Sequence, residues 1–381
     1  MSTANFAIYA ELFDLFFPMV YNARMKKISA VFAALFFAAA FAGCGAPRYT
    51  GKTYTYFNAP ITIQIDSRGL SKARLKEIFD GAENILAEIH ALTDEKNAQS
   101  DVSKFNSLKK DESVPIDPIT ADVVNEALRY SELTGGYFNI LTAPLTELWG
   151  FSAADYGDEN YVFTPPTDAE IAAALPATDL KNIRLEGGIL TKLNDDKTKI
   201  DLGGIAKGYA LKKAREYLEG EGIIYGIISG GSSSLELMKY SENQSFEMGV
   251  KHPRGAADTP PLIEIETENI SVSTSGDYER FYEYEGKRYS HLINPYTGKP
   301  VDDGTMSVTV LGKDGALCDA LSTALAAMGY EKAILFAKNH ADDFSVFIVY
   351  TENGQNYIYS DLPADRFSVS DKSYTVIGGN G

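Results

Sequence analysis

Apolar residues in the first third of this chain recur at two spacings, one typical of strands and one typical of helices. Residues 61–65 (ITIQI) alternate apolar and polar side chains, which predicts a half-buried strand. Ser71 suits the N-cap of a helix, because apolar side chains follow it at helical spacing: Leu75, Ile78, Phe79, Ala82, Ile85, Leu86, Ile89 and Leu92. A second helix is predicted over 120–134, ended by Gly135 and Gly136.

Strands and helices mix in the remainder of the chain without strict alternation. The pattern predicts strands within four segments: 182–204, 222–237, 269–301 and 305–312. A helix is predicted through 316–329, and the polar segment 152–176 is expected to leave the core as an excursion with a short helix. This mixture favours an α+β fold with antiparallel or mixed sheets and packed helices.

The composition indicates a folded acidic protein. The chain has 381 residues, of which 45% are hydrophobic and 23% charged, and its formal net charge is −17. No basic stripe is visible in the sequence, so binding to nucleic acid or to an anionic lipid surface is not expected. An anionic substrate would have to be met locally, by backbone N–H groups, a lysine or a metal ion.

The N-terminal region has the pattern of a targeting signal. Met25 is followed by two lysines, an apolar run over 28–42 and small residues next to Cys44. A cysteine in this place resembles the lipobox of bacterial lipoproteins, in which the cysteine carries lipid. An ordinary secretory signal with an incidental cysteine is the alternative. Residues 1–24 match no signal layout, so we expect translation to begin at Met25.

These features give a domain plan. Residues 1–43 are expected to hold the N-terminal extension and signal peptide, 44–54 a tether, 55–365 a single domain and 366–381 a C-terminal tail. Cys318 is the only cysteine besides Cys44, so no disulfide framework is expected.

The segment 201–210 (DLGGIAKGYA) places two glycines and a lysine where an apolar-periodic helix begins. Backbone N–H groups at Gly203 and Gly204 and the positive end of the helix would suit an anion, with Lys207 as a point charge. The spacing matches neither a P-loop nor a dinucleotide fingerprint. A plain glycine turn that packs a helix on a strand is the alternative.

The segment 318–329 (CDALSTALAAMG) carries a carboxylate and a hydroxyl four residues apart. On a helix Asp319 and Thr323 share one face, where they offer two hard oxygen ligands of the kind that Mg²⁺ accepts. The alternative is structural: Asp319 would favour a helix N-terminus, and Thr323 would bond to a carbonyl one turn earlier.

Two further segments hold candidate polar groups. His291 precedes a Pro-Tyr-Thr-Gly turn, where a histidine can accept a hydroxyl proton near neutral pH or serve as a hydrogen-bonded structural group. Small hydroxyls crowd residues 273–275, beside Gly276 and Asp277. They suit the phosphates or ribose of a nucleotide, and they equally suit a strand that passes into a loop.

These segments together resemble the ApbE family of FAD:protein FMN transferases, from about Tyr56 to about Val349. The motifs occur in order as SDVSKFN (100–106), GGYFNILTAPLTELWGF (135–151), DLGGIAKGYA (201–210), ISGGSSS (228–234), STSGDYERFY (273–282), HLINPYTGKP (291–300) and DALSTAL (319–325). The resemblance implies a single ApbE-like α+β domain. It also implies an enzyme that uses Mg²⁺, cleaves FAD, releases AMP and attaches FMN by a phosphoester bond to a threonine or serine of an extracytoplasmic acceptor.

The resemblance also assigns roles to residues of this chain. The family's metal ligands fall on Asp319, Thr323 and the main-chain oxygen of Ala206, and its HxxxP histidine falls on His291, our candidate base. The implied flavin-nucleotide contacts are Asp201, Gly203, Gly204, Lys207, Ser275, Gly276 and Asp277. The acceptor is expected to belong to a membrane redox complex, which a protein lipidated at Cys44 would meet on the extracytoplasmic side of the membrane.

This chain departs from the family pattern at several positions. It lacks the family's methionine-glycine-threonine string near 56–65, and Asn139 and Asn294 stand where aspartates are usual. Both asparagines keep hydrogen-bonding shape without charge, which leaves flavin contacts and metal affinity open. The sequence alone does not separate the transferase from a metal-dependent FAD pyrophosphatase, in which water replaces the acceptor. A flavin-binding lipoprotein without turnover is a third reading, which intact Asp319, Thr323 and His291 disfavour.

Overall fold

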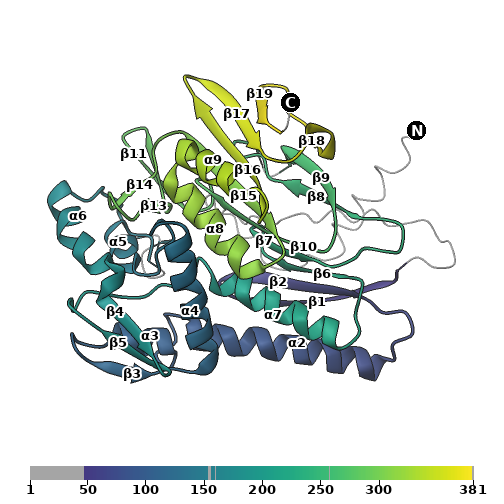
Figure 1. The fold of residues 1–381 in the computed structure, drawn as a ribbon, viewed down its shortest axis with the longest axis horizontal. Coiled ribbons are helices and arrows are strands. Elements are labelled where there is room, and N and C mark those ends of the chain that lie inside the picture. The colour runs from purple at the N-terminus through teal and green to yellow at the C-terminus, as the bar shows by residue number, and fades with distance from the viewer. Residues whose placement is uncertain (1–46, 153–155, 159, 257, 380–381) are drawn as a thin grey trace. The chain divides into compact units, whose positions relative to one another are not determined.

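A nine-stranded sheet forms the centre of the computed structural model, which describes residues 47–152, 156–158, 160–256 and 258–379 (Figure 1). Its strand order is β1-β2-β6-β7-β10-β15-β16-β17-β19. All neighbours are antiparallel except β17 and β19, which are parallel. The strands are β1 (Tyr49–Tyr56), β2 (Ala59–Asp66), β6 (Gly226–Gly230), β7 (Ser234–Leu237), β10 (Ile270–Gly276), β15 (Thr305–Gly312), β16 (Ser345–Glu352), β17 (Gln355–Ser360) and β19 (Tyr374–Gly378).

Helices cover one face of this sheet (Figure 1). They are α2 (Lys72–Thr93), α7 (Ala206–Gly220), α8 (Gly315–Met328) and α9 (Tyr330–Asn339), and α4 (Pro118–Leu133) packs against α2 and α8. Two buried clusters hold them there. One joins β2 to α2, α4 and α7, and the other joins β15 and β16 to α8 and α9. Helix α8 is buried along almost its whole length, so its polar residues face protein rather than solvent.

The opposite face of the sheet packs on a small three-stranded sheet of β8 (Phe246–Val250), β9 (Ile263–Thr267) and β18 (Phe367–Val369). A second three-stranded sheet holds β3 (Ser113–Pro115), β5 (Ile189–Lys192) and β4 (Ile183–Glu186). Short elements complete the fold: α3 (Asp101–Asn106), α5 (Ala143–Leu148), α6 (Asp168–Ala174), β11 (Phe281–Tyr284), β12 (Lys287–Ser290), β13 (Ile293–Asn294) and β14 (Lys299–Pro300).

This architecture confirms the predicted α+β fold with mixed sheets. The predicted strand 61–65 lies within β2, and the two predicted helices are α2 and α4. Ser71 is the N-cap of α2, where its hydroxyl accepts a hydrogen bond of 3.2 Å from the N–H of Arg74. The described part of the excursion over 152–176 includes the short helix α6, which begins with a capping box of Thr167 and Glu170.

The expected tether and the expected tail were both placed wrongly. Tyr49–Tyr56, largely inside the tether, is the edge strand β1 and pairs with β2 along its whole length. The tail includes β18, which pairs with β9, and β19, which pairs with β17. Both segments are mostly polar with one exposed side, so their own pattern is weak. Both segments become strands because they hydrogen-bond to a partner strand. The partner of β18 is β9, which lies about a hundred residues earlier in the chain.

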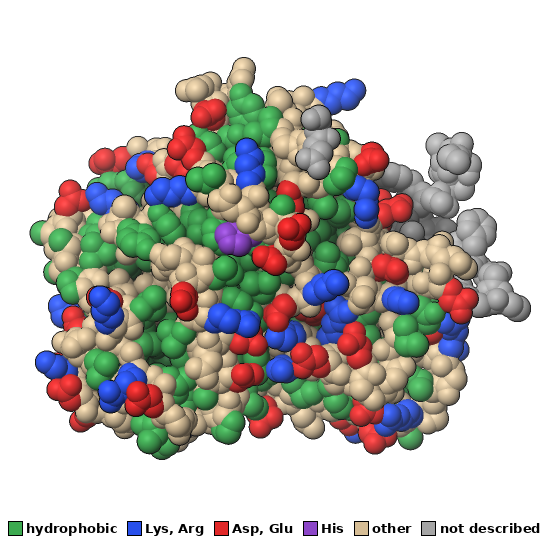
Figure 2. Space-filling view, in the orientation of Figure 1, with side chains coloured by type: hydrophobic (Ala, Val, Ile, Leu, Met, Phe, Trp, Pro, Cys, Tyr) green, Lys and Arg blue, Asp and Glu red, His purple; other side chains and the backbone are tan. Residues whose placement is uncertain are grey.

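The signal peptide, the start at Met25 and the lipidation at Cys44 lie outside the described residues. None of the helices in the part that the structure describes is long and apolar enough to cross a membrane. Cys318 is buried in α8 as a free thiol, and burial, followed by the nearby Glu236, raises its pKa. On the face shown in Figure 2, Lys and Arg side chains lie among Asp and Glu side chains rather than in a separate basic stripe.

Candidate active site

Helices α7 and α8 cross at two glycines, and this crossing creates the centre of the site. A Cβ atom on Gly208 would lie 2.2 Å from the carbonyl oxygen of Gly315 and 2.7 Å from Cβ of Asp319, so only glycine permits this approach. Gly208 is in the first turn of α7, where backbone N–H groups have no partner within the helix. Its N–H donates to Oδ2 of Asp319 at 2.9 Å. A carboxylate of α8 therefore binds the N-terminus of α7.

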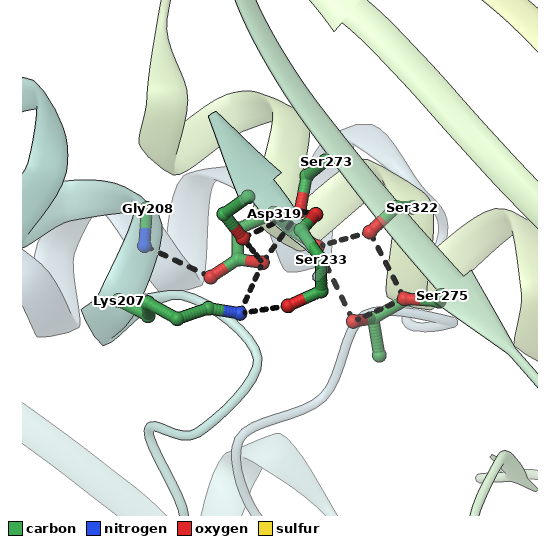
Figure 3. A network of polar contacts seen from close by, with 9 residues as sticks. Lys207, Gly208, Ser233, Ser273, Ser275, Asp319 and Ser322 are labelled. Carbon is green, nitrogen blue, oxygen red and sulfur yellow. Dashed lines mark hydrogen bonds and ion pairs between the residues drawn. The ribbon is translucent and has the colours of Figure 1, made fainter. Parts of the chain in front are cut away.

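The other carboxylate oxygen of Asp319 receives side-chain donors from two strands (Figure 3). Ser273 of β10 lies 2.7 Å from Oδ1, and Ser234 of β7 lies 3.3 Å from it. The ammonium of Lys207 is 3.7 Å from the same oxygen and donates to the hydroxyl of Ser233 at 2.7 Å. Asp319 is only 5% exposed, so these groups replace most of its hydration.

Thr323 lies one turn further along α8 and faces the same turn before α7. A Cβ atom on Gly204 would lie 3.4 Å from its Oγ1 and 3.2 Å from the ring of Phe138. The Thr323 hydroxyl donates to the carbonyl of Asp319 at 3.2 Å and is 3.4 Å from Oγ of Ser275. The backbone bond expected under the structural alternative is thus present for Thr323. Asp319, by contrast, lies in the second turn of its own helix and serves the N-terminus of α7.

The oxygen atoms that this site offers are of the kind that a magnesium ion binds. Asp319 and Thr323 offer hard oxygen atoms, and Ala206 begins α7 with its main-chain carbonyl two residues from Gly208. The described residues contain no cluster of three or more His, Cys, Asp or Glu side chains that could hold a metal alone. A site with one carboxylate therefore suits an ion that takes its remaining ligands from water and substrate phosphates, as Mg²⁺ does.

The remaining residues before α7 are engaged locally. Asp201 accepts a hydrogen bond of 2.7 Å from the N–H of Gly203, which closes a turn and occupies one N–H group predicted for an anion. Gly203 is exposed and Gly204 partly buried, so the turn lies at the surface above Thr323. The stretch is therefore both a tight turn and the approach to the polar cluster around Asp319.

The predicted contacts at the end of β10 separate into two groups. Ser275 belongs to the cluster, because its hydroxyl is 2.9 Å from that of Ser322 in α8. Asp277 instead forms a bidentate ion pair with Arg254, with both distances at 2.7 Å. A Cβ atom on Gly276 would lie 2.6 Å from the ring of Tyr278. Asp277 thus has a structural partner within the chain.

His291 is held by the backbone of Arg280. The carbonyl of Arg280 accepts from the backbone N–H of His291 at 3.0 Å and lies 3.1 Å from its Nδ1. A carbonyl only accepts, so Nδ1 carries the proton and Nε2 is the acceptor nitrogen. Burial, aided by the Arg280 cation, lowers the pKa of His291 to about 3. The ring is therefore neutral around pH 7, and at a pKa this low it is a weaker proton acceptor than an ordinary histidine.

Asn139 and Asn294 serve the backbone locally. Asn139 accepts from the N–H of Leu141 at 2.8 Å and donates to the carbonyl of Thr178 at 2.9 Å. Oδ1 of Asn294 accepts from the N–H of Tyr296 at 2.9 Å and orders the turn after His291. The amide group of Asn139 both donates and accepts here, which a carboxylate would not do.

Several members of the cluster, Ser233, Ser234 and Ser322 among them, were not assigned a role from the sequence. Ser233 and Ser234 lie in the ISGGSSS string, yet nothing in that string shows that it contacts residues 207 and 319. The alternation of serines along β10 could have indicated the cluster. Ser271, Ser273 and Ser275 point to the same side of the strand, and their hydroxyls bond to Glu236, Asp319 and Ser322.

Comparison with known proteins identifies the family. The model of the ApbE family matches residues 57–348, more than half of the chain. The chain belongs to the ApbE family. The FAD:protein FMN transferase of Vibrio cholerae is 33% identical over 283 residues, which cover 72% of this chain and 81% of the relative. The FAD:protein FMN transferase of Salmonella typhimurium is 28% identical over 277 residues, covering 72% of this chain and 77% of the relative.

Solved structures of ApbE proteins share the fold. The ApbE protein of Thermotoga maritima superposes with a TM-score of 0.70 at 30% identity, covering 80% of this chain and 94% of that chain. The flavin transferase ApbE of Vibrio cholerae superposes with a TM-score of 0.69 at 26% identity, covering 82% of this chain and 97% of that chain. The resemblance noted in the sequence is confirmed, and the described residues have an ApbE-like fold.

Proposed function

We infer that this chain is a FAD:protein FMN transferase. Membership of the ApbE family and similarity to FAD:protein FMN transferases support this activity. One observation in the structure carries the inference: Asp319 and Thr323 of α8 lie against the turn and first residues of α7, with Lys207 beside them. A carboxylate, a hydroxyl, a lysine and a helix N-terminus in one place suit the pyrophosphate of a dinucleotide.

We propose that the reaction transfers FMN from FAD to a threonine or serine of an acceptor protein. The acceptor oxygen attacks the phosphorus of the FMN half, a phosphoester bond forms, and the bond to the AMP phosphate breaks. AMP leaves with the electron pair of that bond. The hydroxyl proton passes to Nε2 of His291, which is neutral and unprotonated at that atom.

The residues around Asp319 have separate tasks in this proposal. Asp319, Thr323 and the carbonyl of Ala206 would hold Mg²⁺, which neutralises phosphate charge when it is bound. Lys207 would turn from Asp319 to a phosphate oxygen of FAD, because a cation bound at the carboxylate would repel its ammonium, which lies 3.7 Å from that carboxylate. Gly204 and Ser275 lie next to Thr323 and would contact the nucleotide together with Gly203 in the same turn, whereas the Tyr278 ring fills the space beside Gly276.

We also propose a location for the reaction. The lysine pair, the apolar run and Cys44 support a protein that is lipid-anchored on the extracytoplasmic side of the membrane. Acceptors would then be flavin-carrying subunits of membrane redox complexes. A soluble protein with an uncleaved residue 1–43 segment would contradict this location.

Release of AMP from FAD tests the metal site. We expect Asp319→Asn to lower Mg²⁺-dependent AMP release by about 100-fold or more, since a charge that stabilises the transition state is removed. Asp122→Asn is a matched control, because Asp122 also binds α7, accepting from the Tyr209 hydroxyl at 2.7 Å, but outside this cluster. Undiminished AMP release by Asp319→Asn would contradict the assignment. AMP release with no modified acceptor would favour a pyrophosphatase.

A further inference from the structure

A pair of buried serines lies directly beneath Asp319. Ser234 of β7 and Ser273 of β10 are register partners in the central sheet. They are 2% and 1% exposed, and their hydroxyl oxygens are 3.1 Å apart. Both hydroxyls reach the same carboxylate oxygen of Asp319, at 3.3 and 2.7 Å (Figure 3).

The hydrogen atoms of this pair can be assigned by counting donors. Each serine hydroxyl has one proton, and a carboxylate accepts only. The Ser273 hydroxyl lies 2.7 Å from Oδ1 of Asp319 and 3.3 Å from the carbonyl of Ser233, so the shorter contact makes it the direct donor to Asp319. Ser234 then donates either to Oγ of Ser273 or to Oδ1 itself. In both arrangements Ser273 donates to Asp319. Ser234 either donates to the Ser273 hydroxyl or adds a second, longer hydrogen bond to the carboxylate.

Lys207 reaches the same oxygen in a different way. Its ammonium is 3.7 Å from Oδ1 and makes its shorter contact, 2.7 Å, with Ser233. A divalent cation at Asp319 would repel this ammonium at close range, whereas a serine hydroxyl carries no net charge and can stay. Gly208 holds only the opposite oxygen, Oδ2. The serine pair is thus the fixed partner of Oδ1 when a cation is present.

We propose that Ser273, supported by Ser234, is a positioning residue that holds the Asp319 carboxylate in the orientation needed to bind the metal ion. This inference rests on the proposed function, in which Asp319 is a metal ligand. Groups that hydrogen-bond to a metal ligand generally restrict its rotation and strengthen its affinity for the metal. Removing the Ser273 hydroxyl would leave Oδ1 with the longer contact from Ser234 and with Lys207, which repels the ion.

The chain offers a matched control on the same strand. Ser271 lies two residues before Ser273, points to the same side of β10 and is also 1% exposed. Its hydroxyl donates to Glu236 at 2.7 Å instead of to Asp319. Ser271→Ala therefore removes an equally buried hydroxyl from the same strand without changing the partners of Asp319.

The test is a titration of the full chain, purified in detergent, with Mn²⁺ alone, monitored by electron paramagnetic resonance. We expect Ser273→Ala to weaken Mn²⁺ binding by roughly 10- to 100-fold. Ser273→Thr keeps the hydroxyl and should restore most of the affinity, and Ser271→Ala should remain close to the wild-type value. Binding of FAD in the presence of EDTA, followed by flavin fluorescence, should be the same in all four proteins.

Two results would overturn the proposal. One is equal Mn²⁺ affinity in Ser273→Ala and the wild type. The other is an equal loss in Ser271→Ala, which would mean that any buried cavity in β10 has this effect. A wild-type protein that binds no Mn²⁺ would instead remove the metal site of the proposed function, and the positioning role with it, so the two failures are distinguishable.

Discussion

The backbone N–H of Gly208 donates to the carboxylate of Asp319 across the crossing of α7 and α8. This bond needs both glycines at the crossing, because a Cβ atom on Gly208 would overlap the backbone of Gly315. The relationship joins the GGIAKG and DALST strings, which are more than a hundred residues apart in the chain. The close approach of the two helices therefore places the Asp319 carboxylate at the N-terminus of α7, where the proposed metal site lies.

Gly208→Ala is expected to damage both stability and activity. The added methyl group would lie 2.2 Å from a backbone oxygen, so the helices must separate, at a cost of about 1–3 kcal/mol in the free energy of unfolding. Gly220→Ala, at the other end of α7, meets nothing within 4 Å and should raise stability by roughly 0.5 kcal/mol. Chemical denaturation measures both, and a stable, fully active Gly208→Ala would contradict the role of the crossing.

His291→Gln is expected to lower the rate of FMN transfer by about 100-fold or more while FAD affinity is kept, because a general base is lost. His340→Gln is the control, since His340 also bonds to a backbone carbonyl through Nδ1, at 2.8 Å, but lies at the end of α9. Single-turnover rates and flavin fluorescence separate the two effects. Equal rates in His291→Gln and the wild type would show that His291 is not the base.

The pH dependence of His291 gives a separate prediction. Its folded-state pKa of about 3 is below the ordinary value, so the folded protein keeps the ring neutral. The stabilising contribution is complete above the unfolded pKa near 6.5 and is lost as pH falls towards 3. The NMR signal of the His291 ring should therefore not titrate between pH 5 and 8. A midpoint near pH 6.5 would show that the ring is solvated and charges freely.

The raised pKa of Glu236 predicts a dependence of stability on pH that is opposite in sign to that of His291. Burial is the main cause that raises its pKa to about 7, against hydrogen bonds from Ser271 and Arg215. Stability from its protonated form is complete below the unfolded pKa near 4.5 and is lost as pH rises through 7. Glu236→Gln should thus match the wild type at pH 4.5 and exceed it at pH 8, by on the order of 3 kcal/mol. A constant difference in unfolding free energy across this range would contradict the shift.

Cys44→Ala is expected to move the protein from the membrane to the soluble extracytoplasmic fraction without loss of activity. The reason is that lipid on this residue, rather than a spanning helix, is proposed to hold the protein at the membrane. Cell fractionation with metabolic labelling by a fatty acid measures the change. Wild-type protein that takes up no label would contradict the proposed anchor.

The sequence predicted the elements whose own pattern is strong and the strings that form the site. Helix α2 was recognisable because its apolar stripe and its N-cap serine are local features. Strands β1 and β19 were missed because edge strands depend on a partner strand more than on their own side chains. The same limit applies to the site: Asp319 and Thr323 were found by helical spacing, whereas Ser234 joins them only through the register of β7 with β10.

Mass spectrometry of an acceptor protein tests the proposed transfer of FMN. The chain would be incubated with FAD, Mg²⁺ and a fragment of a flavin-carrying subunit of sodium-pumping NADH:quinone reductase, with the fragment's acceptor threonine replaced by alanine as the control. We expect an acceptor heavier by one FMN, AMP in solution and no change in the alanine control. Intact FAD and an unmodified acceptor, with no AMP released, would contradict the proposed transfer.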